Sequence, residues 1–412
     1  MNSVMSALSE RFSDVRSSTE VLAAPLSAED QAAQSMPDAS PTKWHQAHTT
    51  WFFETFVVGP NLVGYEPFHP AFGYLFNSYY EAVGARHPRP IRGLLTRPSL
   101  DEVHGYRAHV DAGMQQLLTG EIDVETAALV ELGLHHEQQH QELLLMDIKH
   151  LFSCNPLHPA YRQRRDGAPS EARPMNWHEF GGGVVEIGHY GQDFAFDNES
   201  PRHHAYLEPY ALADRPVSCG EWLEFMADGG YERPEFWLSE GWSTVLSERW
   251  QAPLYWFQGD DGWRIFTLGG AHAIDPAEPV CHISLFEADA FARWSKARLP
   301  SEAEWESAAG RVAPLGQLLD LGVLHPRSTE VGSPGYFGDV WEWTSSAYQP
   351  YPGFVTAPGA VGEYNGKFMV NQYVLRGGCC ATPPDHIRAT YRNFFPAAAR
   401  WAFSGLRLAR DL

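Results

Sequence analysis

The spacing of apolar residues changes near residue 155, and this change restricts the fold more than any other feature of the chain. Before it, apolar residues recur at helical intervals in four long segments, at residues 3–23, 44–58, 100–118 and 124–152. Short polar or proline-bearing connections separate these segments. The pattern predicts an antiparallel four-helix bundle over residues 1–154.

Beyond residue 155 the sequence differs in composition and in the spacing of its apolar residues. Residues 155–174 hold several prolines and arginines, which favours an extended linker over a packed element. A run of three glycines and a short β-like piece at 184–188 follow, and tryptophan, glycine and proline become frequent. Only two further helices are expected, at 285–296 and 301–309. The sequence therefore predicts a mixed α/β domain over residues 175–412.

The composition excludes several classes of function. The 412 residues include 51 acidic and 30 basic side chains, a formal charge of −21, without a run of Lys or Arg. This balance would repel nucleic acid and anionic membranes, so small-molecule chemistry is expected. The five cysteines form neither a disulfide framework nor paired CxxC motifs. Neither a signal-peptide layout nor an apolar run of about 18 residues is present, so we expect a cytoplasmic protein in a reducing compartment.

Two histidines in the fourth helical segment are the strongest candidates for a metal site. Residues 135–142 read HHEQQHQE, which places His136 and His140 one turn apart on one helix face, with Cβ atoms about 5–6 Å apart. Burying two imidazoles without partners would cost on the order of a few kcal/mol, whereas one metal ion satisfies both. His135 points to another face and is expected to face solvent or to support a ligand.

A third ligand is expected from another helix of the bundle. The second helical segment reads PTKWHQAHTTWFF at residues 41–53, with His45 and His48 three positions apart. His48 shares a helical stripe with Trp44 and Trp51, the side expected to be buried. This position predicts His48 as the third ligand, although a lone histidine beside apolar residues is more often an ordinary buried histidine.

Several strings, taken together and in order, resemble a known family. The helix motif HxxxHxE, the segment KWHQAHTTWFFE and the tract FNSYYEAVGARHPRPIRG are similar to the ergothioneine-biosynthesis sulfoxide synthases, hercynine-using non-haem iron enzymes that include a selenoneine synthase branch. In the second half, ARLPSEAEWE, GDVWEWTSSAY and VLRGGCCATP resemble the formylglycine-generating-enzyme fold. The resemblance implies an α+β two-domain protein. An N-terminal DinB-like four-helix bundle would be followed by a formylglycine-generating-enzyme-like (C-type-lectin-like) mixed α/β domain.

The resemblance implies Fe(2+) held by His48, His136 and His140, the same set that the spacing suggests. Three neutral ligands leave up to three open positions on an octahedral ion. In this family, O2, a donor thiolate and the imidazole of hercynine meet at the iron, and sulfur becomes bonded to imidazole C2 in a sulfoxide product. The two substrates supply the electrons that O2 needs. Consistently, the sequence holds neither a GxGxxG nor a P-loop motif for a further cofactor.

The resemblance also implies contacts to hercynine. Gln139 and Asn393, followed by Phe394, match positions that bind this substrate, whose quaternary ammonium suits an aromatic face. Without the resemblance, a solvated helix glutamine and a turn asparagine are the commoner roles for such residues.

The sulfur donor and the proton transfer are assigned to a segment upstream. Tyr79 and Tyr80 precede Arg86 and Arg89, whose guanidinium groups are candidate anchors for the donor's carboxylate; a solvated basic loop is the alternative. The resemblance implies that a tyrosine of this segment lies at the iron and passes a proton. Adjacent residues on a helix face different ways, so only one tyrosine acts directly, and Tyr80 is the preferred candidate.

One departure from the family pattern bears on the donor. Relatives that use γ-glutamylcysteine carry an acidic residue where this chain has Phe395. A phenyl ring cannot pair with the donor's ammonium group. The pattern therefore predicts free cysteine as donor and hercynylcysteine sulfoxide as product, with a selenosugar donor and selenoneine synthesis as the alternative.

Functions of other classes stay open at this point. A zinc protease would read HExxH with Glu137 as general base and Asp147 or His150 as a further ligand. A DinB-like zinc-dependent thiol transferase would keep the three histidines without using O2. A binding module without catalytic metal is the non-enzyme alternative.

Overall fold

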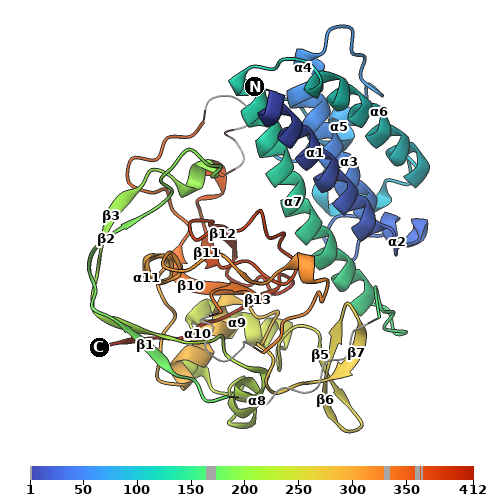
Figure 1. The fold of residues 1–412 in the computed structure, drawn as a ribbon. Helices are drawn as coiled ribbons and strands as arrows, with labels where there is room; N and C mark the ends of the chain where they lie inside the picture. Colours follow the sequence, from blue (N-terminus) through green and yellow to red (C-terminus); the bar gives the residue numbers. More distant parts are fainter. Residues whose placement is uncertain (1, 164–172, 329–334, 358–361, 363–364) are drawn as a thin grey trace. The chain divides into compact units, whose positions relative to one another are not determined.

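The computed structural model describes residues 2–163, 173–328, 335–357, 362 and 365–412. These residues form two compact units, one containing the chain up to Tyr161 and the other residues 162–356 and 365–412 (Figure 1). The domain boundaries expected at residues 154 and 175 stay a prediction, because residues 164–172 of the expected linker lie outside the described residues.

Four long helices build the first unit: α1 (Asn2–Ala23), α3 (Thr42–Phe53), α6 (Leu100–Leu118) and α7 (Val124–Ser153). Both α1 and α3 contact α6 and α7. Shorter pieces occupy the connections: α2 (Ala28–Ala32), α4 (Gly59–Asn61), α5 (Phe72–Phe76) and a 3-10 helix at Arg89–Leu94. The helices expected from apolar spacing are confirmed, with one exception.

The exception is the end of the second predicted helix, where the chain stays helical to residue 58 but is not α-helical after residue 53. Glu54–Val58 forms a π-helix, in which the N–H of Gly59 donates to the carbonyl of Glu54. Pro60, in the short helix α4 that follows, has no N–H to donate to a carbonyl one turn earlier. The Glu54 carboxylate is also held from α6, where the Tyr106 hydroxyl donates to it at 2.6 Å. Apolar periodicity cannot reveal the extra residue of such a turn.

Local side chains fix where the long helices begin. Ser99 accepts a hydrogen bond from the backbone N–H of Glu102, and the Glu102 carboxylate accepts one from the N–H of Ser99 at 2.7 Å, which completes a capping box before α6. Asp123 accepts from the N–H of Thr126 at 2.7 Å before α7. These caps start the two helices whose faces meet α3.

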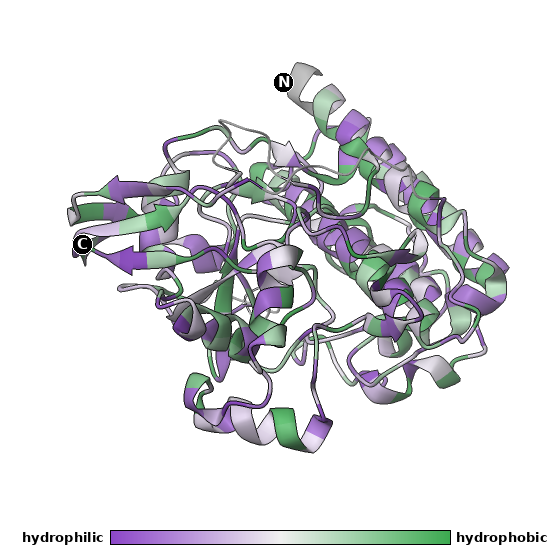
Figure 2. Ribbon diagram, turned by 90° about the horizontal axis from the view of Figure 1, so that it is seen from below, coloured by the Kyte–Doolittle hydropathy of each residue, from purple (hydrophilic) through white to green (hydrophobic). Residues whose placement is uncertain are grey.

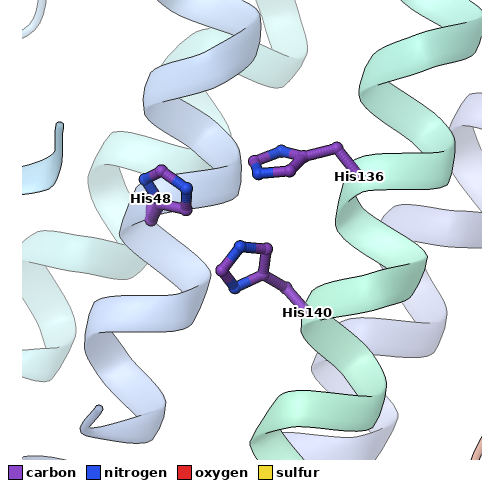
Figure 3. Close-up of side chains that lie close together, drawn as sticks. All are labelled: His48, His136 and His140. Atoms are coloured by element: carbon purple, nitrogen blue, oxygen red, sulfur yellow. The ribbon is translucent and has the colours of Figure 1, made fainter. Parts of the chain in front are cut away.

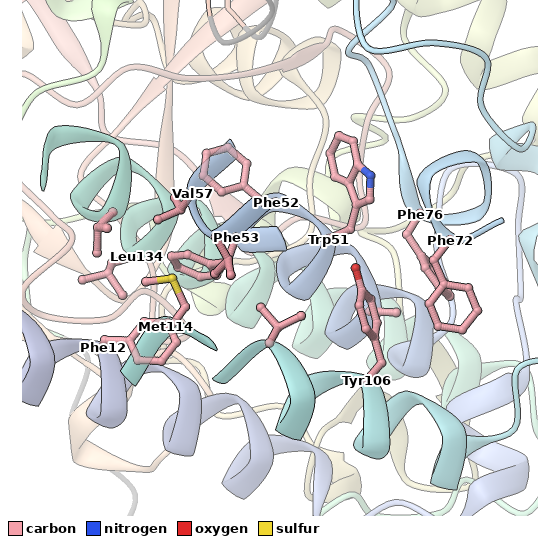
Figure 4. Packing of buried hydrophobic residues seen from close by; sticks show 14 of the residues in the cluster. Phe12, Trp51, Phe52, Phe53, Val57, Phe72, Phe76, Tyr106, Met114 and Leu134 are labelled. Carbon is pink, nitrogen blue, oxygen red and sulfur yellow. The ribbon is translucent and has the colours of Figure 1, made fainter. Parts of the chain in front are cut away.

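Large aromatic side chains fill the space between these helices (Figure 4). Phe12 of α1 meets Phe53 of α3 edge to face, with ring centroids 5.2 Å apart. Leu134 and Met114 are fully buried beside them. Gly133 permits this packing, because a Cβ there would lie 2.6 Å from the ring of Phe53.

The second unit contains several short sheets. Its four-stranded sheet has the order β12 (Asn393–Pro396), β11 (Gln372–Arg376), β10 (Trp341–Ala347), β13 (Ser404–Gly405). Two three-stranded sheets are β1 (Trp177–Phe180), β4 (Tyr210–Ala213), β14 (Ala409–Asp411), and β5 (Trp256–Gly259), β6 (Gly262–Thr267), β7 (Gly270–Ala273). Two strand pairs are β2 (Gly183–Ile187) with β3 (His203–Leu207), and β8 (Gly316–Gln317) with β9 (Phe337–Gly338).

Short helices accompany these sheets: α8 (Cys219–Ala227), α9 (Ser239–Glu248), α10 (Leu285–Trp294) and α11 (Glu302–Ala309). The expected mixed α/β character is confirmed, and α10, α11 and β2 match the predicted elements. Helices α8 and α9 were not expected from the sequence.

Tryptophans and a buried ion pair organise the middle of the second unit. Trp341 and Trp343 on β10 are 1% and 0% exposed, as expected for core residues. Between them Glu342 points the other way, pairs with Arg407 at 2.7 Å and accepts the indole N–H of Trp305 at 2.6 Å. This alternation is the period of two that a strand imposes.

Polar and apolar residues alternate along the helices of the first unit in Figure 2. Helix α3 is buried along its whole length, so its polar residues also lie inside the unit. Within the described part of the chain, no helix combines the length and the apolar character that crossing a membrane requires.

Candidate metal centre

Three buried histidines of the first unit converge on one point (Figure 3). His48 comes from α3, and His136 and His140 come from successive turns of α7. One ligand atom from each imidazole lies within 4.8 Å of the others. The side chains are 1%, 3% and 9% exposed. The structure thus brings together the three residues that the sequence proposes as ligands.

The position of His48 follows from its neighbours on α3. Its ring is stacked between Trp44, at 4.6 Å and an interplanar angle of 12°, and Trp51, at 5.5 Å and 14°. The Nδ1–H of His48 donates to the carbonyl of Phe76. This bond leaves Nε2 as the nitrogen with a free lone pair. The two indoles and the carbonyl therefore hold one nitrogen of His48 ready for a metal.

Burial keeps these imidazoles neutral. Desolvation lowers the pKa of His136 to about 4. Desolvation, followed by the neighbouring His136, lowers the pKa of both His48 and His140 well below the ordinary value. Neutral imidazole is the form that coordinates a metal. Three such donors within reach of each other fit a divalent first-row cation with positions left open for substrates.

The glutamate of the HExxH string lies on another face of α7. Glu137 is fully buried and pairs with Arg16 at 2.8 Å and with Arg107 at 3.1 Å, while Thr19 donates to it at 2.7 Å. Although desolvation opposes them, Arg16 and then Arg107 lower the pKa of this carboxyl. A carboxylate committed to two guanidinium groups is a poor general base, which argues against the zinc-protease alternative.

The other residues considered for that alternative have partners of their own. The Nδ1 of His150 lies 2.7 Å from the Ser35 hydroxyl. Asp147 accepts the backbone N–H of Ser40 at 2.8 Å and lies 3.0 Å from the Nε2 of His45. Neither belongs to the histidine cluster that could hold a metal.

His135 differs from its expected position. It is 3% exposed, so the first of its two expected roles, facing solvent, is wrong, and its Nε2 lies 2.8 Å from the guanidinium of Arg11 on α1. The reason is the packing of α1 against α7, which covers this face of the helix.

The two candidate tyrosines occupy different surroundings. Tyr80 is 3% exposed, and its ring lies 5.6 Å from Trp51, the indole that stacks on His48. Tyr79 is half-buried, and its hydroxyl accepts a hydrogen bond from Arg89 at 2.7 Å. Tyr80 is therefore in the aromatic cluster around the candidate ligand, and Tyr79 is tied to a candidate donor anchor.

The candidate arginine anchors lie at the surface of the first unit. Arg86 donates to the carbonyl of Ser78 at 2.6 Å and pairs with Glu81 at 2.9 Å. Arg89 donates to the carbonyl of Asp38 in addition to Tyr79. Both guanidinium groups have contacts that orient them, so neither belongs to a merely solvated loop.

A third arginine was not recognised from the sequence. Arg92 lies 3.4 Å above the ring of Trp44, on which His48 stacks, and donates to the hydroxyls of Ser40 and Ser78. Desolvation, then Arg89, lowers the pKa of this guanidinium to about 9. Arg92 lies three positions after the candidate anchor Arg89, and this spacing in the sequence could have suggested it.

The remaining candidate contacts divide between the units. Gln139 is half-buried on α7 between the two histidines of that helix. Asn393, Phe394 and Phe395 form part of β12 in the second unit. Phe394 stacks on Tyr348 at 4.1 Å, and Phe395 meets Trp401 edge to face at 5.6 Å. Their role towards a substrate stays a prediction.

The comparisons with known proteins address both units. The sulfatase-modifying factor enzyme 1-like domain family matches residues 180–317 and 322–412. The chain is 31% identical to the hercynine oxygenase of Mycolicibacterium thermoresistibile over 409 residues, covering 91% of this chain and 88% of that protein. It is 30% identical to the hercynine oxygenase of Mycobacterium tuberculosis over 404 residues, covering 91% and 92%. Ergothioneine biosynthesis protein 1 of Schizosaccharomyces pombe is 25% identical over 233 residues, covering 53% of this chain and 28% of that protein.

The two hercynine oxygenase matches each cover 91% of the chain, so they include both the histidine-bearing helices and the mixed domain. The second unit is a sulfatase-modifying-factor-like domain, joined in one chain to a helical unit with a buried histidine cluster. The chain belongs to the hercynine oxygenase family, the ergothioneine-biosynthesis sulfoxide synthases.

Proposed function

We propose that this chain is an iron(II)- and O2-dependent synthase that joins a donor sulfur to imidazole C2 of hercynine. The observation that carries the proposal is the buried cluster of His48, His136 and His140 in a chain that matches hercynine oxygenases over 91% of its length. In this proposal the helical unit is a DinB-like four-helix bundle that holds the iron.

The proposed reaction balances without another cofactor. Hercynine loses the hydrogen on imidazole C2 and the donor loses its thiol hydrogen. One atom of O2 becomes the sulfoxide oxygen, and the other leaves as water with these two hydrogens. Bound iron would supply O2 activation and a site for the thiolate.

Residues of the first unit would guide protons and orient the donor. Tyr80 would move a proton at the reacting oxygen, a role supported by its burial and by its contact with Trp51. Arg86 and Arg89 would bind the donor's carboxylate, which suits their forked N–H groups. Tyr79 would position Arg89 through the bond between them.

Candidate contacts to hercynine are proposed for each unit separately. In the first unit, Gln139 would donate or accept a hydrogen bond at the imidazole. In the second unit, Asn393 and Phe394 are the proposed contacts. A permanent cation such as trimethylammonium favours aromatic faces. The stacked pair of Phe394 and Tyr348 offers such a face.

The preferred donor is free cysteine. Phe395 meets Trp401 and presents no charge to a γ-glutamyl group. A selenosugar donor, with selenoneine as the eventual product, is the second candidate. Phe395 and Trp401 provide no acidic side chain that would select a donor with an ammonium group.

The test is anaerobic reconstitution with iron(II), followed by O2 uptake and product mass with hercynine plus one donor at a time. Cysteine is expected to give hercynylcysteine sulfoxide, with one O2 consumed per product. Turnover with the selenosugar alone would assign the chain to selenoneine synthesis, and turnover with γ-glutamylcysteine alone would refute the argument from Phe395. Metal-dependent thiol transfer without O2 uptake would identify a thiol transferase and end the proposal.

A further inference from the structure

A second histidine of α3 connects the metal centre to a buried carboxylate. The Nδ1 of His45 lies 2.8 Å from the Nδ1 of His140, and its Nε2 lies 3.0 Å from Oδ2 of Asp147. The side chains of His45 and Asp147 are 3% and 6% exposed. The three residues form a buried row, Asp147, His45, His140, that ends at a candidate ligand.

The protons of this row can be assigned from one end. The Oδ2 of Asp147 accepts the backbone N–H of Ser40 at 2.8 Å, and a carboxylate oxygen can only accept a hydrogen bond from His45 as well. The Nε2 of His45 must then be the N–H that donates to Asp147. A neutral imidazole has one N–H, so the Nδ1 of His45 has a lone pair and accepts.

The partner of that lone pair is the Nδ1–H of His140. When Nδ1 of His140 carries the proton, Nε2 of the same ring keeps its lone pair for a metal. The row therefore selects the tautomer of His140 that can coordinate through Nε2. It also explains why His45, three residues before His48, is not itself a ligand: both of its nitrogens are engaged.

We propose that His45 and Asp147 are positioning residues of the metal centre, which fix the tautomer and ring orientation of His140 and raise its affinity for a divalent cation. This inference rests on the proposed metal site. Groups bonded to the outer nitrogen of a ligating histidine orient the ring and increase its basicity. His48 has a neutral carbonyl, that of Phe76, in the same role. His140 instead bonds to His45, and through His45 it is linked to the Asp147 carboxylate, which adds negative charge near the cation.

Three substitutions separate the parts of this role. His45→Phe keeps a ring beside Trp44, whose centroid lies 5.8 Å away, but removes both nitrogens. His45→Gln provides an amide oxygen that can again accept from His140. Asp147→Asn keeps an oxygen acceptor for Ser40 and His45 and removes only the charge.

The control is His135→Phe on the same helix as His140. His135 is as buried as His45 and bonds to Arg11, so its loss reports the general cost of removing a buried histidine near the site. Thermal unfolding of each variant accompanies the measurement and shows which proteins are folded.

The readouts are the dissociation constant for cobalt(II), measured by competition with a chelator, and the visible absorption bands of the bound cobalt. His45→Phe is expected to weaken cobalt binding by about 10–100-fold and to change the bands. His45→Gln is expected to recover most of the cobalt affinity. The affinity of Asp147→Asn is expected to lie between those of wild type and His45→Phe, and His135→Phe is expected to bind cobalt as tightly as wild type. If His45→Phe does not fold, the cobalt affinity of Asp147→Asn tests the positioning role, because this variant can keep the hydrogen bonds from Ser40 and His45.

The outcomes distinguish this inference from the proposed function. Failure of the wild-type protein to bind cobalt or iron, or unchanged binding by His140→Ala, would refute the metal site itself. Loss of binding in His140→Ala together with wild-type affinity and wild-type bands in both His45→Phe and Asp147→Asn would overturn the positioning role alone.

Discussion

Replacing Asp339 by asparagine is expected to stabilise the second unit strongly at pH 8 and little at pH 4. Asp339 is 6% exposed and accepts the backbone N–H of Arg327 at 2.8 Å. Desolvation raises the pKa of this carboxyl from its ordinary value of 3.8 to about 7. That difference is equivalent to about 4 kcal/mol, which is the upper limit for the effect of Asp339→Asn. Asparagine keeps a side-chain oxygen that can accept the N–H of Arg327, and it tolerates the φ of 55° at this position.

The sign follows from which state holds the proton. The folded protein keeps Asp339 protonated up to about pH 7, whereas the unfolded chain ionises it near pH 3.8. The favourable contribution of this group is therefore complete below pH 3.8 and is lost as the pH rises through 7. The asparagine of the variant does not titrate, so the stability difference between variant and wild type grows across this interval.

The assay is hydrogen exchange of peptides from β10, which reports the free energy of opening in the second unit alone. Wild type and Asp339→Asn are compared at matched denaturant concentrations and at several pH values, with Asp320→Asn on the exposed surface as control. Equal protection of wild type and variant at pH 8, or the same difference at pH 4 and pH 8, would refute the reasoning.

Three further predictions concern the stability of the first unit, each measured by urea unfolding. Gly133→Ala is expected to cost about 1–3 kcal/mol, because its Cβ would lie 2.6 Å from the ring of Phe53, and a stabilised protein would contradict this packing. Ser99→Ala removes the cap of α6 and is expected to cost about 1 kcal/mol, so unchanged stability would mean that the capping box contributes nothing. Glu137→Gln removes the buried carboxylate that Arg16 and Arg107 share and is expected to cost about 3–5 kcal/mol; a small effect would show that these pairs are not maintained.

The helices and the histidine cluster were predictable because both depend on short spacings along the chain. Apolar residues at helical intervals identified α1, α3, α6 and α7, and the four-residue spacing of His136 and His140 fixed their common face. His48 was found from the aromatic stripe of α3, whose Trp44 and Trp51 enclose its ring. Each inference needed only the geometry of one helix.

Features that depend on contacts between distant residues were not predictable in this way. The row from Asp147 through His45 to His140 joins two helices, and its sequence separations of 102 and 95 residues give no local signal. The position of Arg92 above Trp44 is equally non-local. In the second unit, β10 pairs in parallel with the two-residue strand β13, and a strand this short has no periodicity to detect.

The most direct test of the account is hercynine-dependent O2 uptake by the iron(II)-reconstituted protein, measured beside its bound iron in wild type, His136→Ala and His135→Phe. We expect one iron per chain and uptake that requires both hercynine and a thiol in wild type and His135→Phe, and neither iron nor uptake in His136→Ala. Iron-loaded wild type that consumes no O2 with hercynine and any donor, or His136→Ala that consumes it at the wild-type rate, would contradict the account.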